Sequence, residues 1–335
     1  ATDMKHQVFA NDSQALAFVT GQAYEVNAQV IAQPYPDWSF NELIFVDTTG
    51  NPWSPGIMTY TSDMSGAAKW QSGHAKDIPL ADVSQDMQLK THQMGAIGYQ
   101  WNLEEVNAAA SFIGGSLSNR RAQAARAAYQ YFMWNLTWFG DAEKGMAGLT
   151  NYPGVPAAAA ASDGTGALPY WVNSAGVGLK TPAQILRDIN RALLGVSTAT
   201  FGTILADTVL MPEEAYEYIA ATPYSAYTTE TILSFVLRTN LYTTRTGRPI
   251  TIRSRRELGV SGTVGAGAGK GRLVAYQNNP TYVKLHLPMP HNFLPVWQDG
   301  PMNYVIPGIF RTGGVEMLIP QSAYYLDGVS ETPVP

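Results

Sequence analysis

Two segments combine glycines with charged residues, and they are the places where this chain could do chemistry. Residues 138–155 read WFGDAEKGMAGLTNYPGV, with two acids, a lysine and four glycines. Residues 259–272 read GVSGTVGAGAGKGR, in which glycines precede a lysine as they do in phosphate-binding loops. Each segment can be tested against the chemistry that it would need.

The segment 259–272 does not match a nucleotide-binding motif. The pattern G-x-x-x-x-G-K-[ST] needs glycine at position 264 and Ser or Thr at position 271, where the chain has Val264 and Gly271. No G-x-G-x-x-G follows a strand and opens a helix either. The segment therefore predicts a flexible hairpin loop in which glycine gives backbone freedom. An intracellular enzyme that binds a ligand here stays open as a remote alternative. The candidate loop residues are Gly265, Gly267, Gly269 and Lys270.

The segment 138–155 follows a long helical pattern. Asp141 and Glu143 would lie at the C-terminal end of that helix, where the helix dipole disfavours acids, so they must be solvated or paired, for example with Lys144. No histidine partner, metal-ligand spacing or phosphate cradle accompanies them. Gly140 suits the left-handed residue that commonly ends a helix. We therefore expect a junction between two packed units, formed by Gly140, Asp141, Gly145, Gly148, Asn151 and Pro153.

The remaining candidates for chemistry are the five histidines, which show no metal-ligand spacing. His286 and His291 lie between prolines, and we expect them to pack against or cap a strand end. No G-x-S-x-G turn provides a nucleophile. The sequence predicts no catalytic residue, no cofactor and no metal.

Composition points to a protein whose surface is covered by partners. Only 14% of the 335 residues are charged, whereas 45% are hydrophobic and 11% aromatic. An average soluble domain has about 25% charged residues. The net charge is −5 and the basic residues are scattered, so we expect at most weak, non-specific contact with DNA. The absence of cysteine excludes disulfides and thiolate metal sites.

The sequence contains no membrane-spanning or targeting pattern. No apolar run approaches the ~18 residues that a bilayer requires, and the first residues lack the pattern of a signal peptide. A protein that is made in the cell and does not enter a membrane is the expectation.

The first half of the chain reads as an arm, a projecting hairpin and a long helix. Residues 1–41 form the arm, 42–48 a strand, and about 56–100 a hairpin whose strands cover 56–70 and 87–101. A helix is predicted over 102–113. The longest predicted helix, 119–139, has its apolar stripe at Ala125, Ala128, Phe132, Leu136 and Phe139.

The second half reads as a compact unit of helices and strands. Helices are predicted over 181–196, with Thr181 as N-cap and Pro182 in the first position, and over 230–240. A buried strand is predicted before Pro212, and another helix is predicted after it. Further strands cover 249–258, 271–277 and 281–288, and two extended segments flank the turn at 312–314. The fold class is therefore α+β.

The order of these parts resembles the Hong Kong 97-type major capsid proteins of tailed phages. The resemblance is carried by KDIPLADVS with IGYQWNLEEV, by RRAQAARAAYQ leading to FGDAEKGMAGLTNYPGV, and by VAYQNNPTYVKLHLPMPHNFLP with FRTGGVEMLIPQSAYYLDGV. The resemblance covers the chain from about residue 40 onward. More specifically, the chain is similar to a phage coat family once catalogued as a domain of unknown function.

The resemblance implies a division of the chain and a function. Residues 1–41 would be the arm, 42–140 the extended loop and peripheral domain with its spine helix, 141–300 the axial domain, and 301–335 the return to the peripheral domain and the tail. Copies would associate as hexamers and pentamers into an icosahedral virion shell around double-stranded DNA, assembled in the host cytoplasm and without enzymatic activity. The hairpin tip would contact a neighbouring subunit through Trp70, His74, Lys76 and Asp77.

The resemblance also implies partners and leaves one alternative. Portal, scaffold and decoration proteins accompany such shells. In some members of the fold, a lysine of the extended loop cross-links to a neighbouring subunit, and Lys69 and Lys76 lie in the corresponding region of this chain. The alternative is an encapsulin-like nanocompartment shell, which encloses a cargo enzyme instead of a genome.

Overall fold

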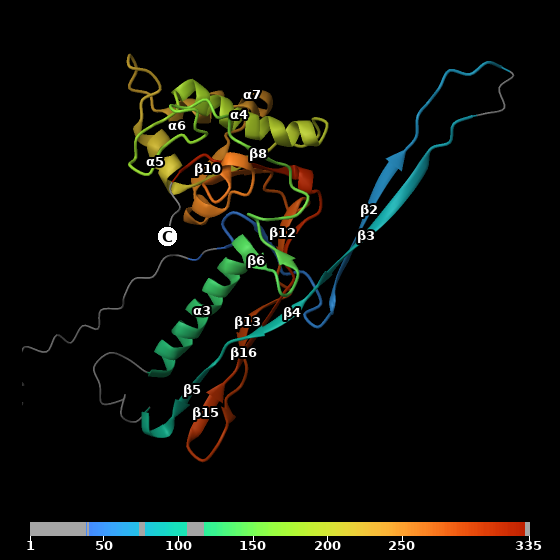
Figure 1. Ribbon diagram of the computed structural model, residues 1–335. Helices are drawn as coiled ribbons and strands as arrows, with labels where there is room; N and C mark the ends of the chain where they lie inside the picture. Colours follow the sequence, from blue (N-terminus) through green and yellow to red (C-terminus); the bar gives the residue numbers. More distant parts are fainter. Residues whose placement is uncertain (1–37, 39, 74–77, 106–116, 332–335) are drawn as a thin grey trace, which may run out of the picture.

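The computed structural model describes residues 38, 40–73, 78–105 and 117–331. Figure 1 shows an α/β unit, an elongated unit built along one long helix, and a hairpin that projects away from both. Of the predicted helix over 102–113, Asn102 instead ends a strand, 103–105 are helical, and the rest lies outside the described residues. Nearly all of the predicted arm also lies outside them.

The α/β unit is built on a five-stranded sheet in the order β10-β9-β11-β18-β8. Strands β9 and β11 are buried along their whole length. Continuous buried runs of this kind are typical of strands that are covered on both faces of the sheet. Alternate residues face two different cores: Val209 packs under the helices, whereas Leu210 faces the elongated unit. The strands are β8 (Ala157–Ala159), β9 (Thr208–Met211), β10 (Thr251–Ser254), β11 (Arg272–Tyr276) and β18 (Ala323–Asp327).

Four helices accompany this sheet, and the start of the first one is as predicted. The Thr181 hydroxyl accepts a hydrogen bond from the Gln184 backbone amide, the Gln184 side chain accepts one from the Thr181 backbone amide, and Pro182 opens the helix. The strand before Pro212 and the helix after it are also confirmed. The helices are α4 (Pro182–Ala199), α5 (Glu213–Ala221), α6 (Ile232–Thr239) and α7 (Leu241–Thr246).

The elongated unit follows α3 (Leu117–Phe139), which confirms the predicted long helix. The predicted apolar stripe is partly wrong. Ala125 and Leu136 are buried, but Ala128, Phe132 and Phe139 are exposed, and the buried face instead runs through Tyr129 and Met133. Apolar residues occur on every side of the second half of this helix, so spacing alone could not fix which face turns inward.

Three small sheets connect α3 to the rest of the molecule. One has the order β1-β12-β17, in which β1 runs parallel to β12; the others have the orders β13-β16-β4 and β14-β15-β5. Their strands are β1 (Phe45–Asp47), β4 (Gln93–Ala96), β5 (Tyr99–Asn102), β12 (Val283–His286), β13 (Met289–Phe293), β14 (Trp297–Gln298), β15 (Asn303–Ile306), β16 (Gly308–Thr312) and β17 (Gly314–Met317).

The projecting hairpin consists of β2 (Gly56–Ser65) and β3 (Asp82–Thr91), which pair with each other and with no other strand among the described residues. This paired region is shorter than the predicted 56–100. After Thr91 the chain stays extended, as predicted, but it pairs with β16 and then with β15. The second half of the predicted hairpin strand therefore belongs to the elongated unit.

Candidate assembly surfaces

The hairpin has two chemically different faces. Cross-strand pairs on one face are Met58–Leu89, Tyr60–Met87 and Met64–Val83. These six side chains are 47 to 82% exposed, and no part of the described chain covers them. The opposite face carries polar pairs such as Thr61–Asp86 and Asp63–Ser84. An isolated two-stranded hairpin is marginally stable in water, so this apolar face is suited to contact another molecule.

The predicted hairpin tip is only partly described. Trp70 is fully exposed, and Ile78 and Leu80 beyond the tip are also mostly exposed. The other three predicted tip residues, His74, Lys76 and Asp77, lie outside the described residues. The apolar character of the hairpin thus extends to both sides of its tip.

The hairpin is held at its base by a close backbone contact and by His92. A side chain at Gly56 would collide with the Lys90 carbonyl group, so only glycine fits there. The His92 backbone donates to the Pro55 carbonyl oxygen at 2.9 Å. Burial lowers the pKa of His92, and the positive charges of His286 and Arg311 lower it further, although a backbone hydrogen bond at Ser54 opposes them.

Next to this base, a buried charged cluster joins strands β12 and β17. The ring nitrogen Nε2 of His286 lies 2.7 Å from Oε2 of Glu316, and both side chains are buried. Burial would raise the pKa of Glu316, but the hydrogen bond with His286 and the charges of His286, Lys284 and Lys90 outweigh it and hold that pKa below its usual value. His291 stacks on Tyr129 and its ring contacts the Ile97 carbonyl oxygen. Both histidines thus have the packing role that the sequence predicts.

The segment 138–155 is a tight reversal in which the predicted glycine turn residues contact one another. Gly140 has φ 72° and pairs with Ala147 across the short strands β6 (Gly140–Asp141) and β7 (Met146–Ala147). The Asn151 side chain accepts from the Gly148 amide and donates to the Phe139 carbonyl oxygen.

The acids and the proline of this segment also have local roles. Asp141 accepts hydrogen bonds from the backbone amides of Glu143 and Lys144. Gly145 has φ 66°, and Pro153 is exposed beside buried Tyr152. These side chains shape the turn, and none of them faces a histidine or a second acid as catalysis would need.

The prediction that 259–272 form a flexible hairpin loop is wrong, both in the pairing of the flanking strands and in the packing of the loop. Strands β10 and β11 are not neighbours, because β9 lies between them. The loop is also packed: Gly267 lies against the backbone of Asp327 and Gly328, where a side chain would not fit. The amides of Thr263 and Val264 donate to the Asp327 carboxylate.

Most other amides of this loop bind within the loop. Gly267, Gly269 and Lys270 donate to Val264, Gly262 and Gly267 respectively, and Gly265 accepts from Ala268. The Lys270 ammonium group donates to the Glu331 carbonyl oxygen at 3.2 Å and lies over the Tyr170 ring. A phosphate cradle needs free amides and a free lysine, so this loop is unsuited to that role.

Arg272 connects the two glycine-containing segments. Its guanidinium group donates to the Thr150 carbonyl oxygen in the turn, to the Thr263 hydroxyl in the loop at 2.6 Å, and to both oxygens of Asp327. It also lies 4.4 Å from the centre of the Tyr325 ring. The segments that looked chemically active are therefore tied to one buried structural cluster.

Neither a metal site nor a membrane helix is found where the structure can be described. In the ranges given above, no three His, Asp or Glu side chains gather as a metal ion would require. Within the same ranges, no helix combines the length and apolar character needed to cross a bilayer.

The sequence profile of the Major capsid protein family matches residues 66–329, which is more than half of the chain. The chain therefore belongs to the major capsid protein family of bacteriophages. Solved structures share its fold. It is similar to a chain from the capsid of Myoviridae phage XM1, with a TM-score of 0.75 at 17% identity, covering 92% of this chain and 98% of that one.

Two further structures extend this likeness. A chain of Microbacterium phage Oxtober96 has a TM-score of 0.59 at 12% identity and covers 97% of this chain and 100% of its own length. A chain from the capsid of an empty GTA particle has a TM-score of 0.59 at 11% identity, covering 94% and 98%. No curated protein matches the sequence significantly. The chain is a structural protein of phage capsids with a mixed helix and strand fold.

Sequence reasoning missed two exposed surfaces. The uncharged second half of α3 exposes Tyr131, Phe132 and Phe139, which were interpreted as core or not considered. Phe201, just after α4, is almost completely exposed. The low proportion of charged residues indicated that such surfaces exist but not where they lie.

Proposed function

We propose that this chain assembles as hexamers and pentamers into an icosahedral shell that encloses double-stranded DNA. The observation that carries the proposal is the hairpin, whose apolar face and Trp70 stay exposed among the described residues of the chain. In a shell, that face would lie on a neighbouring subunit. The shell would form in the host cytoplasm and become part of the virion.

The proposed domains follow the boundaries predicted from the sequence. Residues 42–140 and 301–335 would form the extended loop and peripheral domain, with α3 as spine helix. Residues 141–300 would form the axial domain, whose packed loop at 265–270 would face the capsomer centre. Gly140 to Pro153 would then be the junction through which the two domains keep their relative orientation.

Binding to the packaged DNA would be weak. The net charge of −5 and the scattered basic residues support a wall that does not hold the genome tightly. Portal, scaffold and decoration proteins would bind elsewhere on the shell. The match to the capsid family favours this genome container over a nanocompartment around a cargo enzyme.

Shortening the hairpin tests the proposal directly. Ser65 and Asp82 are a cross-strand pair, so residues 66–81 can be replaced by Asn-Gly, a sequence that joins paired strands through a two-residue turn. We expect the purified full-length chain to form closed particles in negative-stain electron microscopy. The shortened chain should remain folded by circular dichroism and form no shells.

The two possible failures have different meanings. A full-length chain that stays monomeric under all assembly conditions would contradict shell formation. Shells formed by the shortened chain would contradict only the role of the tip. The ratio of absorbance at 260 and 280 nm of particles from infected cells separates a genome from a protein cargo.

A further inference from the structure

Phe201 follows α4 in a backbone conformation that normally needs glycine. Its φ is 53°, and among the described residues only Ala167 is another non-glycine residue with positive φ. The amide of Gly202 donates to the Ser197 carbonyl oxygen, and the amide of Phe201 to that of Thr198. These two bonds define the helix ending in which the residue after the C-cap is left-handed and is usually glycine.

Among the described residues, none covers the phenyl ring of Phe201. The residue is 96% exposed, and a methyl group added at neighbouring Gly202 would meet no atom within 4 Å apart from its two chain neighbours. The residue therefore combines two unfavourable features, a left-handed backbone for a bulky residue and an aromatic ring in water. Glycine at this position would avoid both.

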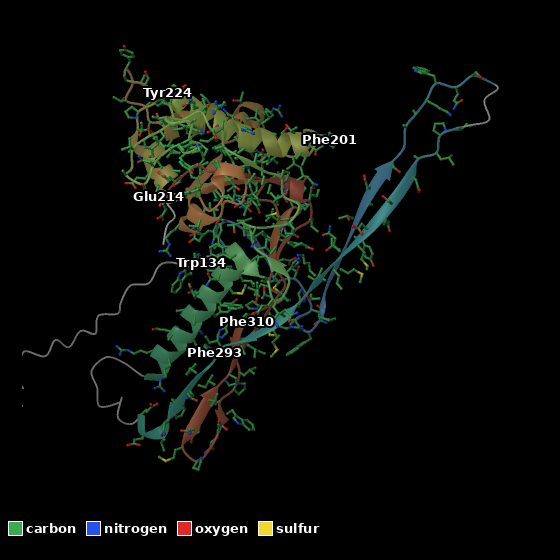
Figure 2. The ribbon with its side chains drawn as sticks, viewed as in Figure 1. Trp134, Phe201, Glu214, Tyr224, Phe293 and Phe310 are labelled. Carbon is green, nitrogen blue, oxygen red and sulfur yellow. The ribbon has the colours of Figure 1, made fainter. Side chains whose placement is uncertain are left out.

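These observations define a surface that is unfavourable in the free subunit and favourable only against a partner. Figure 2 places Phe201 at the edge of the α/β unit on the side from which the hairpin projects, with Tyr224 and Glu214 at the opposite edge. A closed ring needs contacts of this unlike kind, in which one edge of a subunit meets the other edge of the next. Aromatic side chains also dominate the binding energy of protein interfaces.

We propose that Phe201 is an anchor residue that inserts into the opposite edge of the α/β unit of a neighbouring copy of this chain. The inference rests on the proposed shell assembly and adds to it a specific contact between subunits that is separate from the hairpin. The strained helix end holds the ring outward before assembly, so little conformational entropy is lost when the neighbour binds.

The test uses a substitution whose effects on folding and assembly have opposite signs. Phe201→Gly removes the strain and the ring together, so the midpoint of thermal unfolding of the subunit should be unchanged or higher by up to about 2 °C. The protein concentration needed for shell formation should rise by about tenfold or more, as expected for loss of an interface anchor. Phe201→Leu, which keeps an apolar side chain, should restore part of the assembly.

Ala167→Gly is the matched control, because Ala167 also has a positive φ and is exposed, but has only a methyl side chain. It should relieve comparable strain and leave the assembly concentration unchanged. If Phe201→Gly assembles like the unchanged protein, or if it lowers the unfolding midpoint, the proposal is wrong. Failure of the unchanged protein to assemble would instead contradict the proposed function.

A second measurement reports burial of this site directly. The chain has no cysteine, so Thr203→Cys provides a single thiol beside Phe201 without removing the ring. Thr203 is exposed in the subunit. Its reaction with a maleimide should be at least about tenfold slower in shells than in subunits, because a neighbouring copy would exclude the reagent. Equal rates in the two forms would overturn the proposal.

Discussion

Arg272 and Asp327 are partners twice, as a cross-strand pair of β11 and β18 and as a buried ion pair. The Nε atom of Arg272 lies 2.6 Å from Oδ1 of Asp327, and both side chains are almost completely buried. Asp327 also accepts two amides of the loop that follows Gly262, while Arg272 reaches the turn that follows α3. One ion pair therefore fixes two loops that are far apart in the sequence.

Removing one member of this pair should strongly destabilise the subunit. Arg272→Met leaves the Asp327 carboxylate buried without its cation, and such a change typically costs about 3–5 kcal/mol. The free energy of unfolding from urea titrations should fall by this amount. Asp327→Asn should be similarly damaging, because it leaves the guanidinium charge uncompensated.

The control is a more exposed arginine–carboxylate pair with a single contact. Arg238 and Glu230 lie 3.1 Å apart with side-chain exposures of 66% and 31%. Arg238→Met should change the free energy of unfolding by less than about 1 kcal/mol, as is usual for surface pairs. Equal effects of Arg272→Met and Arg238→Met would show that burial does not set the strength of the Arg272–Asp327 pair.

Features with local causes could be predicted from the sequence, whereas long-range pairings could not. Thr181 and Pro182 define the start of α4 within a few residues, and this start is confirmed. Arg272 and Asp327 are separated by 55 positions, and nothing local connects them. The glycines of 259–272 predict a flexible hairpin loop, but β9 inserts between the strands that flank it.

The surfaces proposed for assembly illustrate the same limit. The alternation in β2 and β3 is local, and it indicated a hairpin. The sequence predicts the end of α4 at Val196, but the helix continues to Ala199, so the first left-handed position after it falls on Phe201, and Gly202 behind it is left-handed as well. Moving a helix end by a few residues changes which side chain occupies the left-handed position after the helix. Helix ends are not fixed this finely by sequence patterns.

The His286–Glu316 pair should make the subunit sensitive to acid. The pKa of Glu316 is held below its usual value of 4.5 in the folded chain, so the unfolded state binds a proton more readily than the folded state does. The lowered pKa of Glu316 therefore contributes stability that is fully present above pH 4.5 and is lost as the pH falls through the lower pKa of the folded state. Lys284 and Asp47 also face the cluster, and Asp47 has a lowered pKa that acts in the same direction.

Glu316→Gln tests this prediction. The variant should be less stable than the unchanged subunit at pH 7, and the difference in urea midpoint should shrink as the pH is lowered below 4.5. Glu104→Gln, at an exposed position, is the control and should leave both the midpoint and its pH dependence nearly unchanged. A difference for Glu316→Gln that stays constant between pH 7 and pH 3 would contradict the assignment.

Two glycines in the turn after α3 should respond differently to the same substitution. Gly140 has φ 72°, and a methyl group there would collide with the Met146 carbonyl oxygen. Gly145 has φ 66° but has no atom within 4 Å of the added methyl position. Gly145→Ala should lower the free energy of unfolding by about 1–2 kcal/mol through backbone strain alone. Gly140→Ala should lower it by more than about 3 kcal/mol, because the backbone must also move.

Thermal and urea unfolding of the two variants provide the comparison. If the turn is the domain junction that we propose, the fraction of Gly140→Ala that folds should also give misshapen particles in electron microscopy, whereas Gly145→Ala should give regular ones. Equal destabilisation by the two substitutions would show that the contact with Met146 does not constrain the turn.

The hairpin allows assembly to be tested with two neighbouring residues on opposite faces. Met87 belongs to the apolar face and pairs with Tyr60, whereas Asp86 belongs to the polar face and pairs with Thr61. Both are exposed, so replacing either with serine should change the free energy of unfolding of the subunit by no more than about 0.5 kcal/mol. Met87→Ser should nevertheless raise the protein concentration needed for shell formation by about tenfold, because it removes apolar area from each contact between subunits.

Asp86→Ser should leave that concentration within about twofold of the unchanged protein, provided that the polar face remains in solvent. Light scattering during assembly measures both concentrations, and electron microscopy identifies the products. If Asp86→Ser blocks assembly and Met87→Ser does not, the polar face is the one that meets the neighbour. The hairpin would then dock through hydrogen bonds and charge, and the exposed methionines would need another explanation.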